Sequence, residues 1–420
     1  MPATKGIAVP GDKSITHRAL MLAALTDGPC RISGALVAGD TRASAACLRA
    51  LGVKVSPLKA GAEVVVRGGG LTPFKRPTAR LDCANSGTTA RLLMGLLAAH
   101  RFKATLTGDA SLRRRPMARI ADPLRVMGAR IALKDGRLPA TIEGGALKPL
   151  DYTSPVASAQ VKTAILFAGL AGGVRVSITE PVRSRDHTER LLAMLGVTCM
   201  SSGVFVALHP PESLPAFAGR VPGDISSAAY LLASRILAAK GSLALPGVGV
   251  NPTRIGFIRA VERMGARIKM EGMRESLGEP VATLVARPAR LKALEVEPDE
   301  IPSMVDEVVL LACLAARAEG TSVFKGVGEL RVKESDRLAL VARNLAGLGV
   351  KAHSEDETLW VEGTDEPPQG RVETAGDHRL AMAFAVLGTV KGAKITLDDR
   401  SCVAVSYPSF FKDLKRALRA

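Results

Sequence analysis

The stretch Asn85-Ser86-Gly87-Thr88-Thr89-Ala90-Arg91 runs without a break into the apolar segment Leu92-Leu93-Met94-Gly95-Leu96-Leu97-Ala98-Ala99. A polar, glycine-containing start to an apolar helix directs several backbone N–H groups and the positive end of the helix dipole at one point, where anions bind. Asn and Ser before a helix are also ordinary N-cap residues. The stretch alone therefore leaves two interpretations open, an anion site and a plain helix cap.

The same pattern returns five more times at a spacing of roughly 70 residues, and such self-similarity indicates an internal repeat. Each time a short polar stretch precedes an apolar run that predicts a helix. The five further helix starts are Asp12-Lys13-Ser14, Ser158-Ala159-Gln160-Val161-Lys162, Gly223-Asp224-Ile225-Ser226-Ser227, Val305-Asp306-Glu307 and Gly376-Asp377-His378-Arg379.

A second signature confirms the repeat: a helix that ends in an apolar residue, a glycine and another apolar residue, followed by a strand. Leu51-Gly52-Val53 and Leu195-Gly196-Val197 are examples, and glycine is the usual residue just past a helix end. Short alternating segments such as Thr358-Leu359-Trp360-Val361 predict strands. One repeat therefore reads helix, strand, helix, strand, strand, strand, and the sixth copy stops after its second helix.

Three repeats make about 200 residues, within the usual range for one domain. We expect an α/β protein of two domains, each of three repeated α/β units with helices converging on an interdomain cleft. One domain spans 12–222. The other is discontinuous, 1–11 plus 223–420, and a strand at 5–9 closes it by supplying the strand that the sixth copy lacks. Pro10-Gly11 and Pro222-Gly223 mark the two crossings, because Pro-Gly pairs suit a hinge.

The chain has 420 residues, a formal net charge of +17 and 47% hydrophobic residues. The charge predicts an anionic partner. Aromatic residues make up only 3%, which leaves few platforms for stacking bases, so small polyanionic substrates are favoured over nucleic acid. No apolar run reaches roughly 18 residues and no signal-peptide core is present, so we expect a cytoplasmic protein that does not bind a membrane. No Cys or His spacing predicts a metal site, and no cofactor is expected.

Four motifs resemble, in the same order, those of the 5-enolpyruvylshikimate-3-phosphate (EPSP) synthase family, the 3-phosphoshikimate 1-carboxyvinyltransferases. The segment 9–20 resembles the opening motif of that family, and 81–92 resembles its phosphoenolpyruvate-binding stretch. The segments 330–338 and 377–382 are similar to its two C-terminal signatures. The resemblance spans the whole chain. It implies a fold of two domains, each built from three copies of a small α/β unit, which agrees with the repeats.

The resemblance implies a reaction of the shikimate pathway of aromatic amino-acid biosynthesis. The enolpyruvyl group of phosphoenolpyruvate is added to the 5-hydroxyl of shikimate 3-phosphate, and inorganic phosphate is then eliminated. Two polyanions share one pocket, and arginine forks match carboxylate and phosphate oxygens. The implied shikimate 3-phosphate ligands are Lys13, Ser14, Arg18, Ser158, Ala159, Gln160, Asp306 and Lys333. The implied phosphoenolpyruvate ligands are Lys13, Gly87, Arg115, Gln160, Arg337 and Arg379.

The catalytic carboxylates of the family match Asp306 and Glu334, and Lys13 is the third implied catalytic residue. The reaction needs an acid for the methylene carbon of phosphoenolpyruvate and a base for the 5-hydroxyl. Both carboxylates lie at predicted helix starts, so the alternative is that each only stabilises a helix dipole. His378 is either a core histidine or a participant in the chemistry. We expect a monomer.

Three motifs further resemble the glyphosate-tolerant subgroup of the family: 11–13, 158–162 and 185–189. Gly87 departs from the tolerant members that carry Ala at this position. Two other functions stay open. The sister enolpyruvyl transferase that acts on UDP-N-acetylglucosamine shares the fold, but it has Lys-Asn where this chain has Lys13-Ser14, and a reactive Cys that 113–117 lacks. A basic RNA-binding or RNA-end-processing protein would explain the charge alone.

Overall fold

The computed structural model describes residues 6–420, and contacts divide the chain into two compact units. The N-terminal unit comprises Gly11–Pro222 and the short segment Glu275–Glu279. The C-terminal unit comprises residues 6–10, Gly223–Arg274 and Pro280–Ala420. Residues 275–279 thus belong to the N-terminal unit, although the segments before and after them belong to the C-terminal unit. The sequence did not predict that this short segment would pack with the N-terminal unit.

The N-terminal unit repeats one order of elements three times, and this order is the predicted one except for the additional short helix α4. The first repeat contains α1 (Lys13–Ala24), β1 (Pro29–Ser33), α2 (Gly39–Ala50), β2 (Lys54–Val55), β3 (Val64–Arg67) and β4 (Leu81–Asp82). The second contains α3 (Gly87–Ala98), β5 (Lys103–Thr107), α4 (Ala110–Arg114), α5 (Ala118–Val126), β6 (Arg130–Lys134), β7 (Arg137–Glu143) and β8 (Leu150–Thr153). The third contains α6 (Ala159–Gly172), β9 (Val176–Thr179), α7 (His187–Met194), β10 (Cys199–Ser202), β11 (Phe205–Leu208) and β12 (Ala218–Arg220).

The C-terminal unit follows the same order with one additional strand in each of its first two repeats and with short 3-10 helices, and it ends early, as the sequence predicts. Its first repeat contains α8 (Ile225–Ile236), β13 (Leu243–Gly249), α9 (Gly256–Arg263), β14 (Ile268–Ser276), β15 (Glu279–Ala286), β16 (Leu291–Lys292) and β17 (Glu295–Val296). The second contains the short helix η1 (Ile301–Ser303), α10 (Val308–Ala315), β18 (Ala318–Glu319), β19 (Thr321–Phe324), η2 (Gly328–Val332), α11 (Arg337–Gly347), β20 (Ala352–Glu355), β21 (Thr358–Glu362) and β22 (Gln369–Val372). The last contains α12 (His378–Leu387), β23 (Lys394–Leu397), η3 (Ser401–Val405) and α13 (Phe410–Arg419).

The sheets of the N-terminal unit close into a ring. Each has four strands, in the orders β12-β1-β3-β2, β4-β5-β7-β6 and β8-β9-β11-β10. The last strand of each repeat pairs in parallel with the first strand of the next, and β12, from the end of the unit, pairs with β1 at its start. Every sheet therefore takes one strand from a neighbouring repeat, which ties the three repeats into one body.

The N-terminal segment takes the corresponding position in the C-terminal unit. The Ile7 amide donates to the Ala244 carbonyl of β13 at 3.3 Å, and the Ile7 side chain is buried in the core of this unit. The predicted strand at 5–9 is nevertheless not formed by residues 6–9, and Lys5 lies outside the described residues. The segment thus lies against the first repeat of the C-terminal unit through this hydrogen bond and through apolar burial, without forming a regular ladder.

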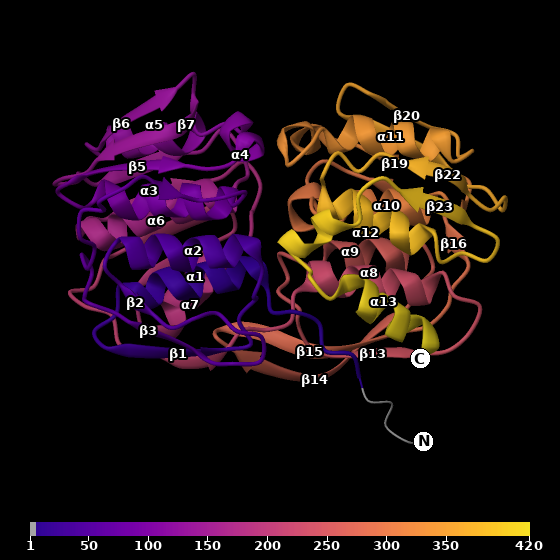
Figure 1. The fold of residues 1–420 in the computed structure, drawn as a ribbon, viewed down its shortest axis with the longest axis horizontal. Helices are drawn as coiled ribbons and strands as arrows, with labels where there is room; N and C mark the ends of the chain where they lie inside the picture. The colour runs from indigo at the N-terminus through magenta and orange to yellow at the C-terminus, as the bar shows by residue number, and fades with distance from the viewer. Residues whose placement is uncertain (1–5) are drawn as a thin grey trace. The chain divides into compact units, whose positions relative to one another are not determined.

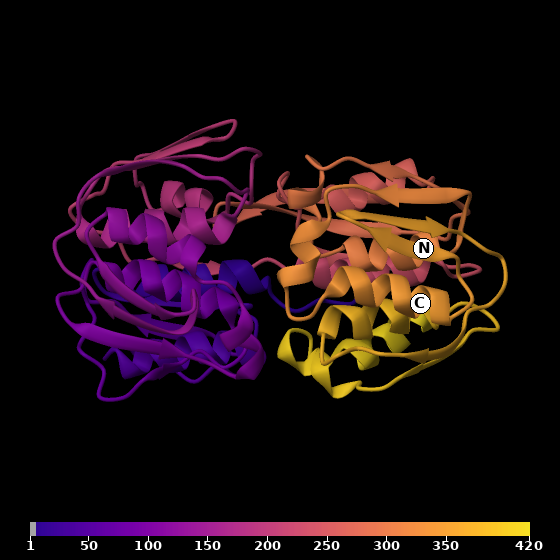
Figure 2. The ribbon, with the colours of Figure 1, turned by 90° about the horizontal axis from the view of Figure 1, so that it is seen from above.

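Three interior helices form the centre of each unit. The six predicted polar starts precede α1, α3, α6, α8, α10 and α12, and these helices form the interior, with every residue of α8 and α10 buried. Figure 1 and Figure 2 show the helices inside each unit and the sheets toward its outside. In the N-terminal unit a Cβ on Gly95 would overlap the Ala164 main chain, so this glycine lets α3 and α6 pack closely. No helix within residues 6–420 is long and apolar enough to cross a membrane.

Candidate active site

The interior helices are capped at their N-termini, and most caps come from the predicted polar stretches. Ser86 accepts a hydrogen bond from the Thr89 amide at the start of α3, and Ser158 accepts from the Val161 amide at the start of α6. The cap interpretation left open at Asn85–Arg91 is therefore correct for Ser86. It does not exclude an anion site, because a side-chain cap satisfies only one or two of the four amides that a helix start leaves unbonded. Asp12, Asp224 and Asp377 cap α1, α8 and α12 in the same way.

Arg18 connects two of these helices in the N-terminal unit. It is buried in α1, and its guanidinium donates to the hydroxyls of Thr188 and Thr163, each at 2.8 Å. It also donates to the backbone carbonyls of Ser14 at 3.0 Å and Ala159 at 3.5 Å. These acceptors are neutral. Burial lowers the pKa of Arg18 to about 10, although Glu189 opposes the shift. The guanidinium is thus a buried cation whose charge its hydrogen-bond partners do not neutralise.

Gln160 connects α6 to α3. Its side-chain oxygen accepts a hydrogen bond from Arg91 at 2.6 Å, and its amide donates to the Thr88 hydroxyl at 3.0 Å. Lys13, the first residue of α1, lies 3.2 Å from the Asp40 carboxylate, and the Asp40 carbonyl accepts from Thr89 of α3. The predicted residues of this unit are therefore brought together around the starts of α1, α3 and α6.

Arg115 reaches the same region in a way that the sequence did not predict. Arg115 is not at a helix start, because it is the C-cap residue of the short helix α4. Its guanidinium nevertheless donates to the Asn85 side chain at 2.7 Å. A Cβ added to Gly87 would lie 3.3 Å from Arg115 Nη1 and 3.2 Å from Arg91 Nη1. Two guanidinium groups thus lie beside the first residue of α3.

Arg337 is the centre of a second cluster, in the C-terminal unit. Its side chain is 1% exposed, and its Nε donates to Asp377 at 2.7 Å. Glu334 accepts from Arg337 Nη2 at 2.5 Å, and Asp306 lies 3.8 Å from Nη1. Burial by itself would lower the pKa of Arg337, but Asp377 and Glu334 outweigh it, and the net shift is upward. Three carboxylates therefore surround this one cation.

Arg379 and Lys333 complete this cluster. Arg379 Nη2 lies 3.5 Å from the Asp306 carboxylate, and Nη1 donates to the Asp306 carbonyl at 3.0 Å. Burial opposes the charge of Arg379, but Asp306 and neighbouring groups raise its pKa overall. Lys333 lies 3.0 Å from Glu329, and burial, with a contribution from Arg337, lowers the pKa of Lys333. All five predicted residues of the C-terminal unit thus belong to one cluster.

Several residues of the two clusters were not predicted as site residues. Asp377 holds Arg337, Arg91 holds Gln160, and Lys162 forms a buried ion pair with Glu180 at 2.8 Å. Glu180 in turn accepts from the Ser158 amide at 3.1 Å. Asp377, Arg91 and Lys162 lie within the polar stretches at the helix starts, so that pattern contained a signal for them. His378 is buried as the first residue of α12.

Each cluster has groups that suit anions, and the cluster of the C-terminal unit also has groups that suit proton transfer. Buried cations at helix starts attract phosphate and carboxylate groups. The carboxylates that contact Arg337 are groups that can carry protons. Within residues 6–420 no group of three or more His, Cys, Asp or Glu side chains has the geometry to hold a metal ion.

Comparisons with known proteins agree with this chemistry. The family model described as "EPSP synthase (3-phosphoshikimate 1-carboxyvinyltransferase)" matches residues 2–414. The 3-phosphoshikimate 1-carboxyvinyltransferase of Gloeobacter violaceus is 49% identical over 413 residues, covering 98% of this chain and 95% of the relative. The enzyme of the same name from Geobacillus kaustophilus is 44% identical over 416 residues, covering 98% and 97%.

A solved structure of the EPSP synthase from Acinetobacter baumannii superimposes with a TM-score of 0.87 at 39% identity, covering 98% of this chain and 95% of that one. The enolpyruvyl transferase NikO from Streptomyces tendae, at 19% identity and a TM-score of 0.80, shares the fold. The sister transferase and the RNA-binding protein are therefore set aside. The chain belongs to the EPSP synthase family and has its 3-phosphoshikimate 1-carboxyvinyltransferase activity in the shikimate pathway.

Proposed function

We propose that the two clusters act on the same two substrates, shikimate 3-phosphate and phosphoenolpyruvate. The observation that carries this proposal is Arg337, a buried cation that contacts both Asp306 and Glu334. An anionic substrate bound to this guanidinium would be placed directly beside two carboxylates that can transfer protons. The reaction proceeds by addition followed by elimination, and the residues involved require no metal or cofactor.

Shikimate 3-phosphate is bound mainly by the N-terminal unit in this proposal. The buried Arg18 suits its phosphate, because the hydrogen-bond partners of this guanidinium include no carboxylate, and the amides at the start of α6 supply further donors. Asp306 and Lys333 of the C-terminal unit would contact its ring hydroxyls. The full set is Lys13, Ser14, Arg18, Ser158, Ala159, Gln160, Asp306 and Lys333.

Phosphoenolpyruvate is bound by cations of both units in this proposal. Arg115 lies beside Gly87 at the start of α3, and Arg337 and Arg379 lie at the starts of α11 and α12. A guanidinium presents two parallel donors that match the carboxylate or the phosphate of this substrate. Lys13 and Gln160 supply further donors.

In this proposal Asp306 and Glu334 carry out the proton transfers, and Lys13 is the third catalytic residue. In the addition, one carboxylate removes the proton of the 5-hydroxyl, whose oxygen attacks C2 of phosphoenolpyruvate, while an acid protonates the methylene carbon. In the elimination, a base removes a proton from the resulting methyl group, the double bond re-forms and inorganic phosphate leaves. Lys13 stabilises the negative charge that develops on the oxygens of the reacting groups.

A direct experiment mixes the pure protein with shikimate 3-phosphate and phosphoenolpyruvate, without added metal, and follows phosphate release. We expect release that depends on both substrates and is unchanged by a chelator. A parallel reaction offers UDP-N-acetylglucosamine in place of shikimate 3-phosphate. Release only with the UDP-sugar, or only after metal is added, would contradict the proposal.

We further propose that the chain belongs to the glyphosate-tolerant subgroup and that Gly87 sets how far it tolerates the inhibitor. The proposal rests on the motifs at 11–13, 158–162 and 185–189. A methyl group on Gly87 would lie close to Arg91 and Arg115, in space that glyphosate, a small molecule with a phosphonate and a carboxylate, could use. We expect Gly87→Ala to raise the concentration of glyphosate that halves the rate. An unchanged value would contradict a role for this position.

The protein is also proposed to act as a monomer in the cytoplasm. Sedimentation equilibrium tests the first point, with a mass near 43.9 kDa expected for a single chain. Cell fractionation tests the second. A mass near twice that value, or recovery of the protein in the membrane or exported fraction, would contradict these statements.

A further inference from the structure

The helix α10 starts differently from the other interior helices of the C-terminal unit. Asp224 and Asp377 turn their carboxylates back onto the amides at the starts of α8 and α12. Glu307, the N-cap residue of α10, makes no such hydrogen bond. Its side chain is 2% exposed, so a carboxylate has been buried without serving the helix that it begins. A buried carboxylate is costly unless other groups hold it.

Two residues from other elements hold this carboxylate. The Ser226 hydroxyl of α8 donates to Glu307 Oε1, and Arg254, from the loop before α9, lies 3.4 Å from the same oxygen. Arg254 also donates to the Ser226 hydroxyl at 2.6 Å. Glu307 Oε2 is buried and has no hydrogen-bond partner among the described residues. Oε1 is thus the oxygen through which these two residues hold the carboxylate.

The group that faces Glu307 is Arg379. Arg379 Nη1 lies 3.8 Å from Glu307 Oε1 and donates to the carbonyl of the preceding residue, Asp306. Arg379 Nη2 faces the Asp306 carboxylate. The guanidinium is therefore held along its Nη1 side by consecutive residues of one helix start, while its Nη2 side lies beside a proposed catalytic carboxylate.

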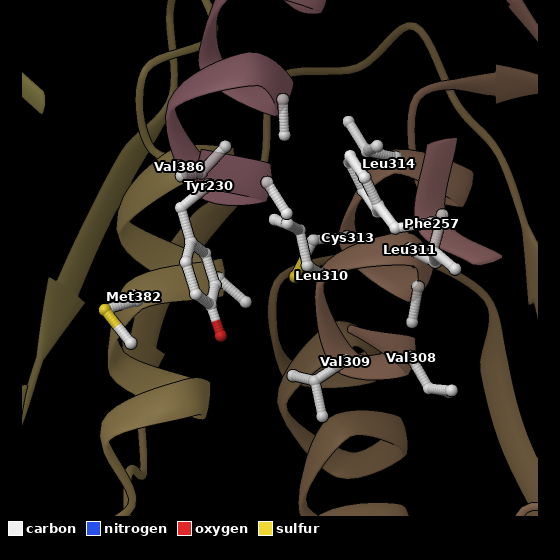
Figure 3. Close-up of a cluster of buried hydrophobic side chains, with 14 of the residues drawn as sticks. Tyr230, Phe257, Val308, Val309, Leu310, Leu311, Cys313, Leu314, Met382 and Val386 are labelled. Atoms are coloured by element: carbon white, nitrogen blue, oxygen red, sulfur yellow. The ribbon is translucent and has the colours of Figure 1, made fainter. Parts of the chain in front are cut away.

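Tyr230 and Asp224 are further polar groups that interact with Arg379. The Tyr230 ring is buried between α10 and α12, and Figure 3 shows its hydroxyl pointing away from Val386, on the side of Met382 and Val309. Burial raises the pKa of Tyr230, so its hydroxyl stays neutral, and it has no hydrogen-bond partner among the described residues. Asp224 and Glu307 thus both bring negative charge to Arg379 without belonging to the proposed chemistry, and Glu307 Oε1 lies 3.8 Å from Arg379 Nη1.

We propose that Glu307 is a positioning residue: its carboxylate, fixed by Ser226 and Arg254, holds the Arg379 guanidinium in the orientation that binds phosphoenolpyruvate. Glu307 would not touch the substrate and would act only through Arg379. This inference rests on the proposed role of Arg379 in binding phosphoenolpyruvate.

The test measures the Michaelis constants of both substrates for Glu307→Gln, which keeps the shape of the side chain and removes its charge. We expect the value for phosphoenolpyruvate to rise about tenfold, as for loss of one charge-assisted contact, and the value for shikimate 3-phosphate to stay within about twofold. The control is Asp413→Asn, a buried carboxylate on α13 that accepts from Ser409 and Arg416. This control should change neither constant. If Glu307→Gln fails to fold, Ser226→Ala should give a smaller rise in the same direction.

A double variant separates this inference from the proposal beneath it. Arg379→Ala should raise the Michaelis constant for phosphoenolpyruvate, and adding Glu307→Gln should then raise it no further, because residues that act through one group are not additive. An unchanged value in Arg379→Ala overturns the role of Arg379 and the inference with it. Two outcomes would overturn the inference while leaving the role of Arg379 intact. In the first, the Michaelis constant for phosphoenolpyruvate rises in Arg379→Ala but not in Glu307→Gln. In the second, both variants raise it and the double variant shows the product of the two effects.

Discussion

The two units are built from the same repeat, yet they hold their cations differently. Arg18 in the N-terminal unit donates to hydroxyls and carbonyls, and its pKa falls to about 10. Arg337 in the C-terminal unit is equally buried but contacts Asp306, Glu334 and Asp377, and its pKa rises. The first arrangement leaves positive charge for a ligand. The second supplies carboxylates that can transfer protons, so we infer that the reaction's proton chemistry belongs to the C-terminal unit.

The largest effect expected from this difference is on turnover. Glu334→Gln and Asp306→Asn should each lose roughly 10²–10⁴ in turnover, the usual contribution of a general acid or base. Affinity for shikimate 3-phosphate, measured by calorimetry, should stay within a few fold. The matched control is Asp336→Asn, because Asp336 caps α11 from the same motif. This control should keep turnover within tenfold of the wild type. If Glu334→Gln and Asp306→Asn did so as well, the two carboxylates would be only helix caps, and the proposed difference between the units would be wrong.

The next largest effect is on the free energy of unfolding, which should differ between variants of Arg337 and Arg18. Arg337→Met leaves buried carboxylates without their cation, and breaking a buried ion pair in this way costs about 3–5 kcal/mol. Arg18→Met should change the free energy of unfolding by no more than about 1 kcal/mol, because it removes a cation that is itself costly to bury. Its partners Thr163 and Thr188 already bond each other at 2.7 Å, so they would not be left unsatisfied. Urea unfolding of both variants measures these changes. Equal losses in the free energy of unfolding would contradict the proposed difference between the two arginines.

Affinity for phosphoenolpyruvate gives the next effect in size. Arg115→Ala and Arg379→Ala should each remove a charge-assisted contact of roughly 1.5–3 kcal/mol, which raises the Michaelis constant about tenfold or more. One variant lies in each unit, so similar rises would show that both units bind this substrate. Steady-state rates at varied phosphoenolpyruvate provide the test. No rise in either variant would contradict the proposal that these arginines bind phosphoenolpyruvate.

The smallest expected effect is on acid stability. Burial opposes ionisation of Asp377, but Arg337 outweighs it, and the pKa lies below the ordinary value of 3.8. The unfolded chain therefore binds more protons near this pH, so the stabilisation is present above about 3.8 and is lost as the pH falls through the folded value. Urea unfolding between pH 6 and 3 should show the stability gap between the wild type and Asp377→Asn closing at the acid end. A gap that stays constant would contradict the assignment.

The repeat explains why so much of the fold could be predicted. Apolar runs behind a polar start recur in all six copies, and the structure places an interior helix at each. The structure also places motif residues of the C-terminal unit around Arg337, and their roles in the reaction stay predictions. These predictions succeed because the local pattern determines both the helix and the residues at its N-terminus.

What the sequence could not predict depends on contacts between distant segments. Arg115 reaches Asn85 from the end of a short helix, which no periodicity indicates. Residues 275–279 pack with the N-terminal unit through Leu277, whose side chain is buried in the core of that unit. Glu307 looks like any acidic residue at a helix start, and only its contacts with Ser226 and Arg254 distinguish it from a cap.

The most direct test of the difference between the units follows deuterium entry into the methylene group of phosphoenolpyruvate during turnover in deuterated solvent, with both substrates saturating. We expect slow entry in Glu334→Gln and Asp306→Asn, because the proton transfers themselves are impaired. Arg115→Ala should exchange at nearly the wild-type rate once phosphoenolpyruvate saturates, since it loses binding only. Fast exchange in both carboxylate variants, or equally slow exchange in Arg115→Ala, would contradict the assignment of proton chemistry to the C-terminal unit.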